Sequence, residues 1–188
     1  MMATDNQAWS VNESSVNSDN PGKILSDWEF AHITFSFGFV RWVEKCMEAS
    51  GLRGLTALDV LVLHAVNLRA RRRRVSEISM VLNVDDSHLV AYSLKKLVAA
   101  KLVQTVRDRR ESRYETTPYG DEACKAYMSI RQKFLVPMVN MVANVANEMG
   151  HMATVVTILT GIYDQAARQA TAHAELLPKL PPVRTKKQ

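Results

Sequence analysis

In the middle of the chain, the pattern of apolar and polar positions predicts two helices separated by a turn. The first helix covers residues 76–82, the turn lies at 83–85, and the second helix covers 86–100. An apolar face at helical spacing holds a helix to its domain and leaves the opposite face outward. In the second helix this face is expected to consist of Leu89, Val90, Leu94 and Leu97.

A short hairpin is predicted directly after these helices. Residues 103–107 and 114–117 have the composition of short strands, and they flank an arginine-rich turn at 108–113. Two helices, a turn and a hairpin in this order are typical of a winged helix-turn-helix. Such a unit usually places its second helix in the major groove of DNA.

The N-terminal part of the chain predicts one long helix with a narrow apolar seam. Ser26 is expected to cap this helix together with Glu29, and the helix should end at about Ala49. The seam alternates steps of four and three residues, which is typical of a helix that pairs with another helix. Its members are Trp28, His32, Phe35, Phe39, Trp42 and Cys46.

Further helices are predicted after the hairpin. Thr117 and Pro118 suit the cap and the first position of a helix, which Pro137 is expected to kink or restart. An apolar stripe rich in methionine continues to about residue 172, and Gly150 is a candidate division within it. Neither the N-terminal helix nor the C-terminal helices have a core of their own to cover their apolar stripes. A symmetric homodimer in which these helices bury one another is the simplest arrangement. Its expected interface residues are Trp28, Phe35, Phe39, Trp42, Val155, Leu159 and Ile162.

The length of 188 residues and the apolar fraction of 47% fit a globular domain with appendages. The expected fold class is mainly α with a small β-hairpin wing, flanked by N- and C-terminal dimerisation helices. The expected divisions are a flexible arm (1–22), an N-terminal dimerisation helix (23–50), the winged helix-turn-helix (51–120), C-terminal dimerisation helices (121–176) and a flexible tail (177–188).

The net charge of +5 is concentrated in the central part of the chain. Residues 69–113 hold twelve Lys or Arg and five Asp or Glu, so the remainder is slightly acidic. Such an excess is expected for a polyanionic partner, here double-stranded DNA, although a solvated basic face has the same pattern. A nuclear localisation signal is one interpretation of the arginine run at 69–74. A linker along the DNA backbone agrees better with the module that follows.

The second helix of the motif carries the side chains expected to read DNA. Asp85 or Asp86 can cap it by accepting backbone N–H groups. Its outward side chains can hydrogen-bond base edges or phosphates, and an Ala methyl can contact the methyl of thymine. These side chains are Ser87, His88, Ala91, Tyr92 and Lys95. Lys95 and Lys96 are expected to contact phosphates at the groove wall.

Arginine in the wing suits the minor groove, where the electrostatic potential is strongly negative. The wing residues expected to contact DNA are Asp108, Arg109, Arg110 and Arg113. Asp108 would act by fixing one guanidinium through a bidentate pair. Further phosphate contacts are expected from Arg72, Arg73, Arg74 and Ser76. The alternative is an exposed charged turn with no role in DNA binding.

Several of these segments resemble the MarR family of winged-helix transcriptional regulators. They are Leu55-Thr56, Leu82-Asn83-Val84, Leu102-Val103, the wing motif Asp108-Arg109-Arg110 and the segment from Thr116 to Gly120. The resemblance implies a bacterial homodimer that binds a pseudo-palindromic operator, and we expect a repressor. It also implies that a small ligand or an oxidant often relieves DNA binding, so a small-molecule effector is a candidate partner.

Three features depart from the family pattern. Lys101 stands where the family usually has glycine after the recognition helix, and a residue with a side chain destabilises a left-handed backbone there. The wing is slightly shorter than usual, which limits its reach into the minor groove. The base-reading side chains are not transferable from the family, so the sequence identifies no operator.

Other chemistry has little support in the sequence. Phosphate-binding glycine loops, HExxH and GxSxG are absent, so we expect no enzyme, no catalytic residue and no cofactor. Cys46 and Cys124 stand outside any metal-ligand spacing, which favours two reduced, buried thiols and no metal site. No apolar run approaches the roughly 20 residues of a membrane span, and no secretory signal is evident. We therefore expect a cytoplasmic protein that is nucleoid-associated when bound to DNA.

Two alternatives to this interpretation stay open. A winged-helix protein-interaction module would use the same basic face for an acidic partner and would not read DNA. Such a module could keep its activity without Arg109, Arg110 and Arg113, whereas a DNA reader could not. The other alternative, within the regulator class, makes Cys46 a peroxide sensor.

Overall fold

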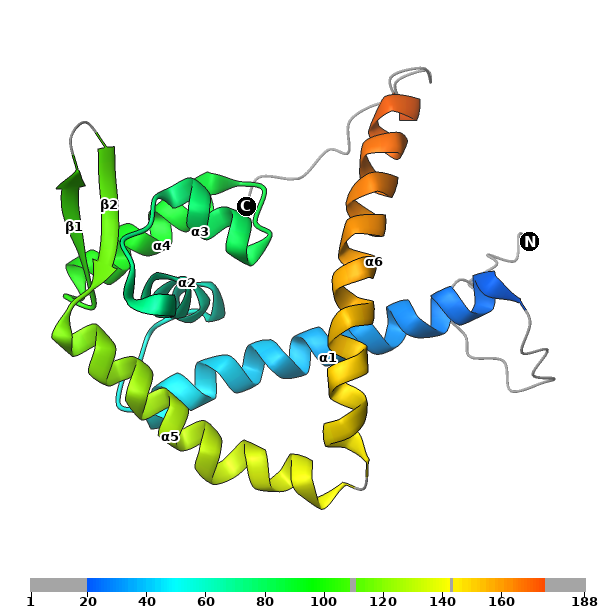
Figure 1. Cartoon of the computed structure of the whole chain (residues 1–188), viewed down its shortest axis with the longest axis horizontal. Coiled ribbons are helices and arrows are strands. Elements are labelled where there is room, and N and C mark those ends of the chain that lie inside the picture. Colours follow the sequence, from blue (N-terminus) through cyan, green and yellow to red (C-terminus); the bar gives the residue numbers. More distant parts are fainter. Residues whose placement is uncertain (1–19, 109–110, 143, 175–188) are drawn as a thin grey trace, which may run out of the picture. The chain divides into compact units, whose positions relative to one another are not determined.

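The computed structural model describes residues 20–108, 111–142 and 144–174, and it divides into two compact units between Ile130 and Arg131. The elements in chain order are α1 (Pro21–Ala49), α2 (Ala57–Asn67), the short 3-10 helix η1 (Leu68–Ala70), α3 (Val75–Leu82), α4 (Ser87–Ala99), β1 (Val103–Asp108), β2 (Glu111–Thr116), α5 (Pro118–Met141) and α6 (Val145–Ala174) (Figure 1). The predicted fold class, mainly α with a small antiparallel hairpin, is confirmed.

The core of the first unit is built around α2, which lies between α1 and the pair α3–α4 (Figure 1). Apolar side chains of α2 and α4 pack there against the last turns of α1 and the first turns of α5. The fully buried members include Val43, Met47, Val60, Leu63, Val66, Ile78, Leu94, Leu97 and Leu102. Burial of this cluster fixes α3 and α4 in the arrangement of a helix-turn-helix.

Three fully buried side chains, Val90, Leu94 and Leu97, hold α4 to this core. The prediction that Leu89 joins them is wrong, because Leu89 is 51% exposed. Adjacent residues of a helix point about 100° apart. The residue before Val90 therefore falls beside the buried face rather than on it.

Both helices of the helix-turn-helix end in a left-handed residue, Asn83 with φ 52° and Lys101 with φ 60°. At the end of α4, the Leu102 N–H donates to the Leu97 carbonyl and the Lys101 N–H donates to the Val98 carbonyl. This is the Schellman arrangement, in which glycine is the usual left-handed residue. Lys101 thus differs from the usual glycine in residue type, but it adopts the same left-handed conformation and the turn is preserved.

The start of α1 differs from the prediction. The helix begins at Pro21 and is capped by Asn20, whose side chain accepts the Gly22 N–H at 3.0 Å. Ser26 lies inside the helix and its hydroxyl donates to the Gly22 carbonyl, so the predicted cap at Ser26 is wrong. Asn followed by Pro at the first helical position is the stronger start signal. The predicted end of the helix at Ala49 is confirmed.

The C-terminal helices divide at a different place from the one predicted. Pro137 lies within α5 and does not restart it, and Gly150 lies within α6 and does not divide it. One helical glycine costs only about 1 kcal/mol, which is too little to break a long helix. The chain turns between Met141 and Val145, where Asn144 has φ 64°.

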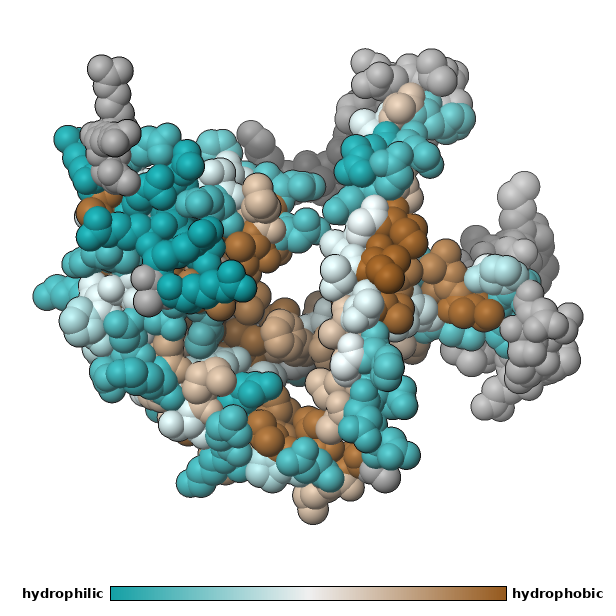
Figure 2. Space-filling view, in the orientation of Figure 1, coloured by the Kyte–Doolittle hydropathy of each residue, from teal (hydrophilic) through white to brown (hydrophobic). Residues whose placement is uncertain are grey.

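The two long helices near the ends of the chain, α1 and α6, expose many large apolar side chains. On α1 they are Ile24, Leu25, Phe30, Ile33, Phe35, Phe37, Phe39 and Val40, and on α6 they are Met149, Met152, Val155, Val156, Ile158, Ile162 and Tyr163. Figure 2 shows hydrophobic surface along the middle of α6 and the N-terminal half of α1. Of the helices that the structure describes, none is long and apolar enough to span a membrane. Residues 1–19 of the predicted arm and the predicted tail lie outside the described residues.

Candidate nucleic-acid interface

The outward face of α4 is exposed and mostly polar. Asp86 caps the helix by accepting the His88 N–H at 2.9 Å, as the sequence predicted for one of two neighbouring aspartates. The side chains of the predicted reading face are all exposed, and Tyr92 is 72% exposed. They are Ser87, His88, Ala91, Tyr92 and Lys95. Their contact with DNA stays a prediction.

Lys96, which the sequence predicted to contact phosphate, is directed toward the domain. Its Nζ lies 2.6 Å from Asp59 Oδ2 and donates to the Gly54 carbonyl at 2.8 Å. Asp59 also accepts the Ser93 hydroxyl at 2.8 Å and the Thr56 N–H at 2.9 Å. The ammonium of Lys96 is thus held between α4 and the start of α2, and we leave it out of the phosphate contacts.

The carboxylate of Asp59 is ionised in spite of its burial. Desolvation raises the pKa of this group, but hydrogen bonds from Lys96, the Thr56 backbone and Ser93 together bring it below its ordinary value. Asp59 also completes the predicted capping box with Thr56, whose hydroxyl accepts the Asp59 N–H. One carboxylate therefore caps α2 and fixes α4.

Arg73 was predicted to contact phosphate, and the structure corrects this as well. The residue is only 3% exposed. Its backbone pairs with Tyr114 of β2 through two hydrogen bonds of 3.0 and 2.8 Å, and its guanidinium donates to the Leu68 carbonyl at 3.0 Å. Arg73 thus joins the segment between η1 and α3 to the wing and cannot reach DNA while the fold is intact.

Arg72 lies on the surface beside the wing. Its Nε donates to Glu115 Oε2 at 2.7 Å, and Gln104 donates to the other oxygen of the same carboxylate at 2.7 Å. These two hydrogen bonds lower the pKa of Glu115. Arg72 is therefore exposed but held in a defined position across the two strands.

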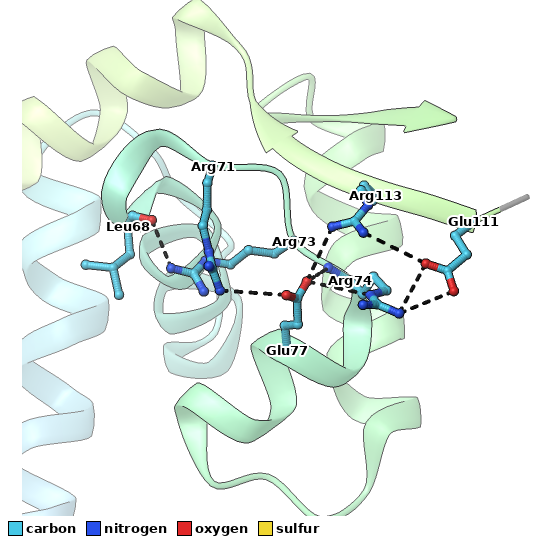
Figure 3. Close-up of polar contacts among 7 residues, drawn as sticks. All are labelled: Leu68, Arg71, Arg73, Arg74, Glu77, Glu111 and Arg113. Atoms are coloured by element: carbon cyan, nitrogen blue, oxygen red, sulfur yellow. Dashed lines mark hydrogen bonds and ion pairs between the residues drawn. The ribbon is translucent and has the colours of Figure 1, made fainter. Parts of the chain in front are cut away.

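Glu77 of α3 lies among three arginines, two from the residues before α3 and one from β2 (Figure 3). It accepts the Arg74 backbone N–H at 2.7 Å, which lowers its pKa together with the charges of the surrounding arginines. Its carboxylate oxygens lie 3.6 Å from the Arg71 guanidinium and 3.9 Å from those of Arg74 and Arg113. Glu111 of β2 lies 3.2 Å from Arg74 and 4.0 Å from Arg113.

The sequence placed Arg113 in the turn of the wing, but in the structure it lies within strand β2. The strands extend further than expected, so Arg113 pairs with Val106 inside the hairpin. Its side chain is largely covered and is directed toward Glu77 (Figure 3). The predicted contacts of Arg109, Arg110 and the Asp108 side chain lie outside the part of the wing that the structure describes. Ser76 is exposed in the first turn of α3.

The cysteines and histidines define no second site. Among the described residues, no group of three His, Cys, Asp or Glu could hold a metal ion. Cys46 and Cys124 are buried, as predicted, and burial raises the pKa of Cys124 to about 12. The His64 ring packs edge-on against Tyr127 at 4.6 Å, and burial lowers its pKa.

Comparison with known proteins agrees with this geometry. Residues 55–120 match a family model described as a winged helix DNA-binding domain. The transcriptional regulator BldR from Sulfolobus solfataricus has a similar structure, with a TM-score of 0.60, 17% identity, and coverage of 73% of this chain and 98% of BldR. No curated protein sequence matches the chain significantly.

Two further structures are similar at comparable identity. MarR from Staphylococcus aureus, solved with salicylate and kanamycin, has a TM-score of 0.57 and 18% identity, and the match covers 77% of this chain and 95% of that one. A MarR transcriptional regulator from Methanosarcina mazei has a TM-score of 0.56 and 16% identity, with coverage of 73% and 91%.

Residues 55–120 of the chain form a winged helix domain of the DNA-binding type. The fold of the chain is that of the MarR-family transcription regulators, which confirms the resemblance that the sequence motifs indicated.

Proposed function

We propose that the protein is a sequence-specific DNA-binding transcriptional regulator that binds a pseudo-palindromic operator as a homodimer and acts as a repressor in the cytoplasm. The observation that carries the proposal is the outward face of α4. This face is exposed and polar, while the opposite face is fully buried and Lys96 ties the helix to Asp59. A rigidly held helix with adaptable polar side chains is what reading of the major groove requires.

In this proposal each part of the interface has a separate role. The α4 residues Ser87, His88, Ala91, Tyr92 and Lys95 enter the major groove, and Asp108, Arg109 and Arg110 place the wing in the minor groove. Arg72, Arg74 and Ser76 contact phosphates, and Ser76 does so through its hydroxyl near the start of α3. Arg73, Lys96 and Arg113 support the fold and are not in the contact set.

The exposed apolar faces of α1 and α6 support the homodimer. No described side chain of α6 is buried, although this helix carries seven large exposed apolar residues. Contiguous apolar surface of this kind marks an interaction site on a water-soluble domain. We propose that residues 23–50 and 121–176 of two copies cover one another, with the seven predicted interface residues among the contacts.

A small-molecule effector is a further part of the proposal. The support is the Staphylococcus aureus MarR structure, which was solved with salicylate and kanamycin. Salicylate is therefore a suitable first ligand, to be added to the protein–DNA complex. Release of DNA at a salicylate concentration that leaves the free protein folded would support an effector role.

Fluorescence anisotropy tests DNA reading. The protein selects duplexes from a random library, and its affinity for the enriched duplex and for a shuffled duplex is measured across a salt series. We expect preferential binding to the enriched duplex that weakens steeply with salt. Tyr92→Ala should lose about tenfold or more in affinity for the enriched duplex and little for the shuffled one.

Tyr119→Ala is the matched control, because Tyr119 is an exposed tyrosine on α5 outside the proposed DNA contacts. This variant should bind both duplexes as the wild type does. Failure to enrich any sequence, with equal weak binding to all duplexes, would exclude sequence-specific regulation and favour the protein-interaction module.

A further inference from the structure

The arginines beside the helix-turn-helix are held by carboxylates of the same chain. Arg71 and Arg74 precede α3, and Arg113 approaches them from β2 (Figure 3). Glu77 lies within 4 Å of all three guanidinium groups, and Glu111 lies within 4 Å of two of them. The basic face found in the sequence is therefore partly neutralised in the folded protein.

These ion pairs have the features of replaceable contacts. The N···O distances range from 3.2 to 4.0 Å, and the side chains of Arg71, Arg74 and Glu111 are about half exposed. Exposed pairs of this kind add little to stability, since both groups remain hydrated and screened. A DNA phosphate offers a guanidinium two non-bridging oxygens that share one negative charge, so it can accept the same paired hydrogen bonds as a carboxylate. An incoming phosphate can therefore replace a carboxylate without unfolding the site.

Glu77 is kept ionised by the same surroundings. The Arg74 backbone N–H and the neighbouring guanidinium charges hold its pKa below the ordinary value. The negative charge that competes for the arginines is thus present throughout the neutral range. Because Glu111 is the first residue of β2 and pairs with Arg74, the competition takes place on the wing, beside the residues that precede α3.

We propose that Glu77 and Glu111 screen Arg71 and Arg74 from non-target nucleic acid, and that this screening sets the preference of the protein for its operator. Non-specific binding is almost entirely electrostatic, so neutralised arginines weaken it strongly. Operator binding gains base contacts in addition, which can offset the displacement of the carboxylates. The effect on specificity rests on the proposed function, whereas the screening itself does not.

The test compares Glu111→Gln with Glu122→Gln in the full-length protein. Both substitutions remove one negative charge from an exposed ion pair, but Glu122 pairs with Lys125 on α5. The first measurement is the salt concentration at which each variant elutes from a heparin column, since heparin is a polyanion without base sequence. Elution of Glu111→Gln at higher salt than Glu122→Gln is expected. Coincident elution, or earlier elution of Glu111→Gln, would overturn the screening.

The second measurement is anisotropy with the shuffled and enriched duplexes. Glu111→Gln should bind the shuffled duplex several-fold more tightly, and the slope of log K against log salt should steepen by about 0.9 for one additional phosphate contact. Affinity for the enriched duplex should rise less, so the specificity ratio falls. An equal gain for both duplexes would overturn the effect on specificity.

Glu77→Gln provides an independent variant, because a Gln carbonyl can still accept the Arg74 N–H. If circular dichroism shows that this variant is unfolded, Glu111→Gln alone decides. If the wild type selects no duplex, the proposed function fails, and the heparin comparison still decides whether the carboxylates screen the arginines.

Discussion

Lys96 Nζ lies 2.6 Å from Asp59 Oδ2, and this contact joins α4, the helix proposed to read DNA, to the first turn of α2. The same carboxylate accepts the Thr56 N–H, so the cap of one helix also sets the position of the other. The geometry of the proposed DNA-reading face thus depends on a buried group that touches no DNA. Residues that support a binding face from behind often determine how precisely its side chains are positioned.

Asp59→Asn should destabilise the protein near neutral pH and change its acid response. The introduced amide would keep one oxygen acceptor, but its NH2 group would face either the Lys96 ammonium or the Thr56 N–H, which are both donors. Removal of the buried charge that pairs with Lys96 costs about 3 kcal/mol. In the wild type the folded-state pKa of Asp59 is below its ordinary value. Its stabilisation is therefore present above the unfolded pKa of about 3.9 and is lost as the pH falls through the folded pKa.

Urea unfolding of both proteins between pH 7 and pH 3 measures this difference. The two free energies of unfolding should differ most at neutral pH, and the difference should narrow as the pH falls below the unfolded pKa of about 3.9. A difference that stays constant over the whole range would show that the ionised form of Asp59 contributes nothing.

Lys101→Gly should stabilise the protein. Lys101 has φ 60°, a conformation that costs a residue with a side chain about 1–2 kcal/mol and costs glycine almost nothing. The greater conformational freedom of glycine in the unfolded chain lowers the free energy of unfolding by about 0.4–1 kcal/mol. The expected net gain is about 0.5–1 kcal/mol, measured by urea unfolding.

The neighbouring residue supplies the control for this substitution. Ala100 has φ −78°, which suits any residue, so Ala100→Gly should lower the free energy of unfolding. If both variants shift stability in the same direction, the left-handed backbone of Lys101 is not the cause.

The fold could be predicted from the sequence where its signals are local. The capping box of Thr56 and Asp59 spans three residues, and Thr117 caps α5 by accepting the Gly120 N–H three residues later. Such motifs use short-range geometry that the residue types alone specify. The errors in helical detail were also local, since Asn20 caps α1 in place of Ser26 and Leu89 lies one step outside the buried face.

The candidate site could be predicted less completely, because its charges are paired across the fold. Lys96 and its partner Asp59 are separated by 37 positions, and Arg72 and Glu115 by 43. Nothing in the spacing of a basic run indicates which of its members a distant carboxylate will hold. The acids that neutralise the arginines were visible only as scattered residues, so the sequence overestimated how much of the basic face is available to DNA.

Gly120→Ala should destabilise the winged unit. A Cβ at this position would overlap the Leu102 carbonyl oxygen, so the start of α5 and the chain after α4 would have to separate. Overpacking of this kind costs about 1–3 kcal/mol or more when the obstacle is backbone. The measurement is the free energy of unfolding from urea titration.

Gly150→Ala is the matched control, because a Cβ there meets no atom within 4 Å. It should leave stability unchanged or raise it by about 0.5–1 kcal/mol, as alanine favours a helix. Equal destabilisation by both substitutions would mean that the close approach to Leu102 is not what requires glycine at position 120.

Phe35→Glu should weaken the proposed homodimer without unfolding the winged unit. Phe35 is 66% exposed and stacks on Phe39 with ring centroids 6.1 Å apart, so the buried core does not depend on it. Loss of an aromatic anchor at the centre of an interface costs about 2 kcal/mol or more, which corresponds to a dissociation constant raised about 30-fold. Sedimentation equilibrium over a concentration series measures this constant.

Tyr119→Glu separates loss of the interface from loss of an exposed aromatic side chain. Tyr119 is 54% exposed at the start of α5, outside the seven predicted interface residues. This variant should stay dimeric, whereas Phe35→Glu should shift toward monomer and lose affinity for a two-fold operator because each copy reads one half-site. If Phe35→Glu and the wild type sediment identically as dimers, the dimer is held by another surface. A wild type that stays monomeric at all concentrations would remove the homodimer from the proposal.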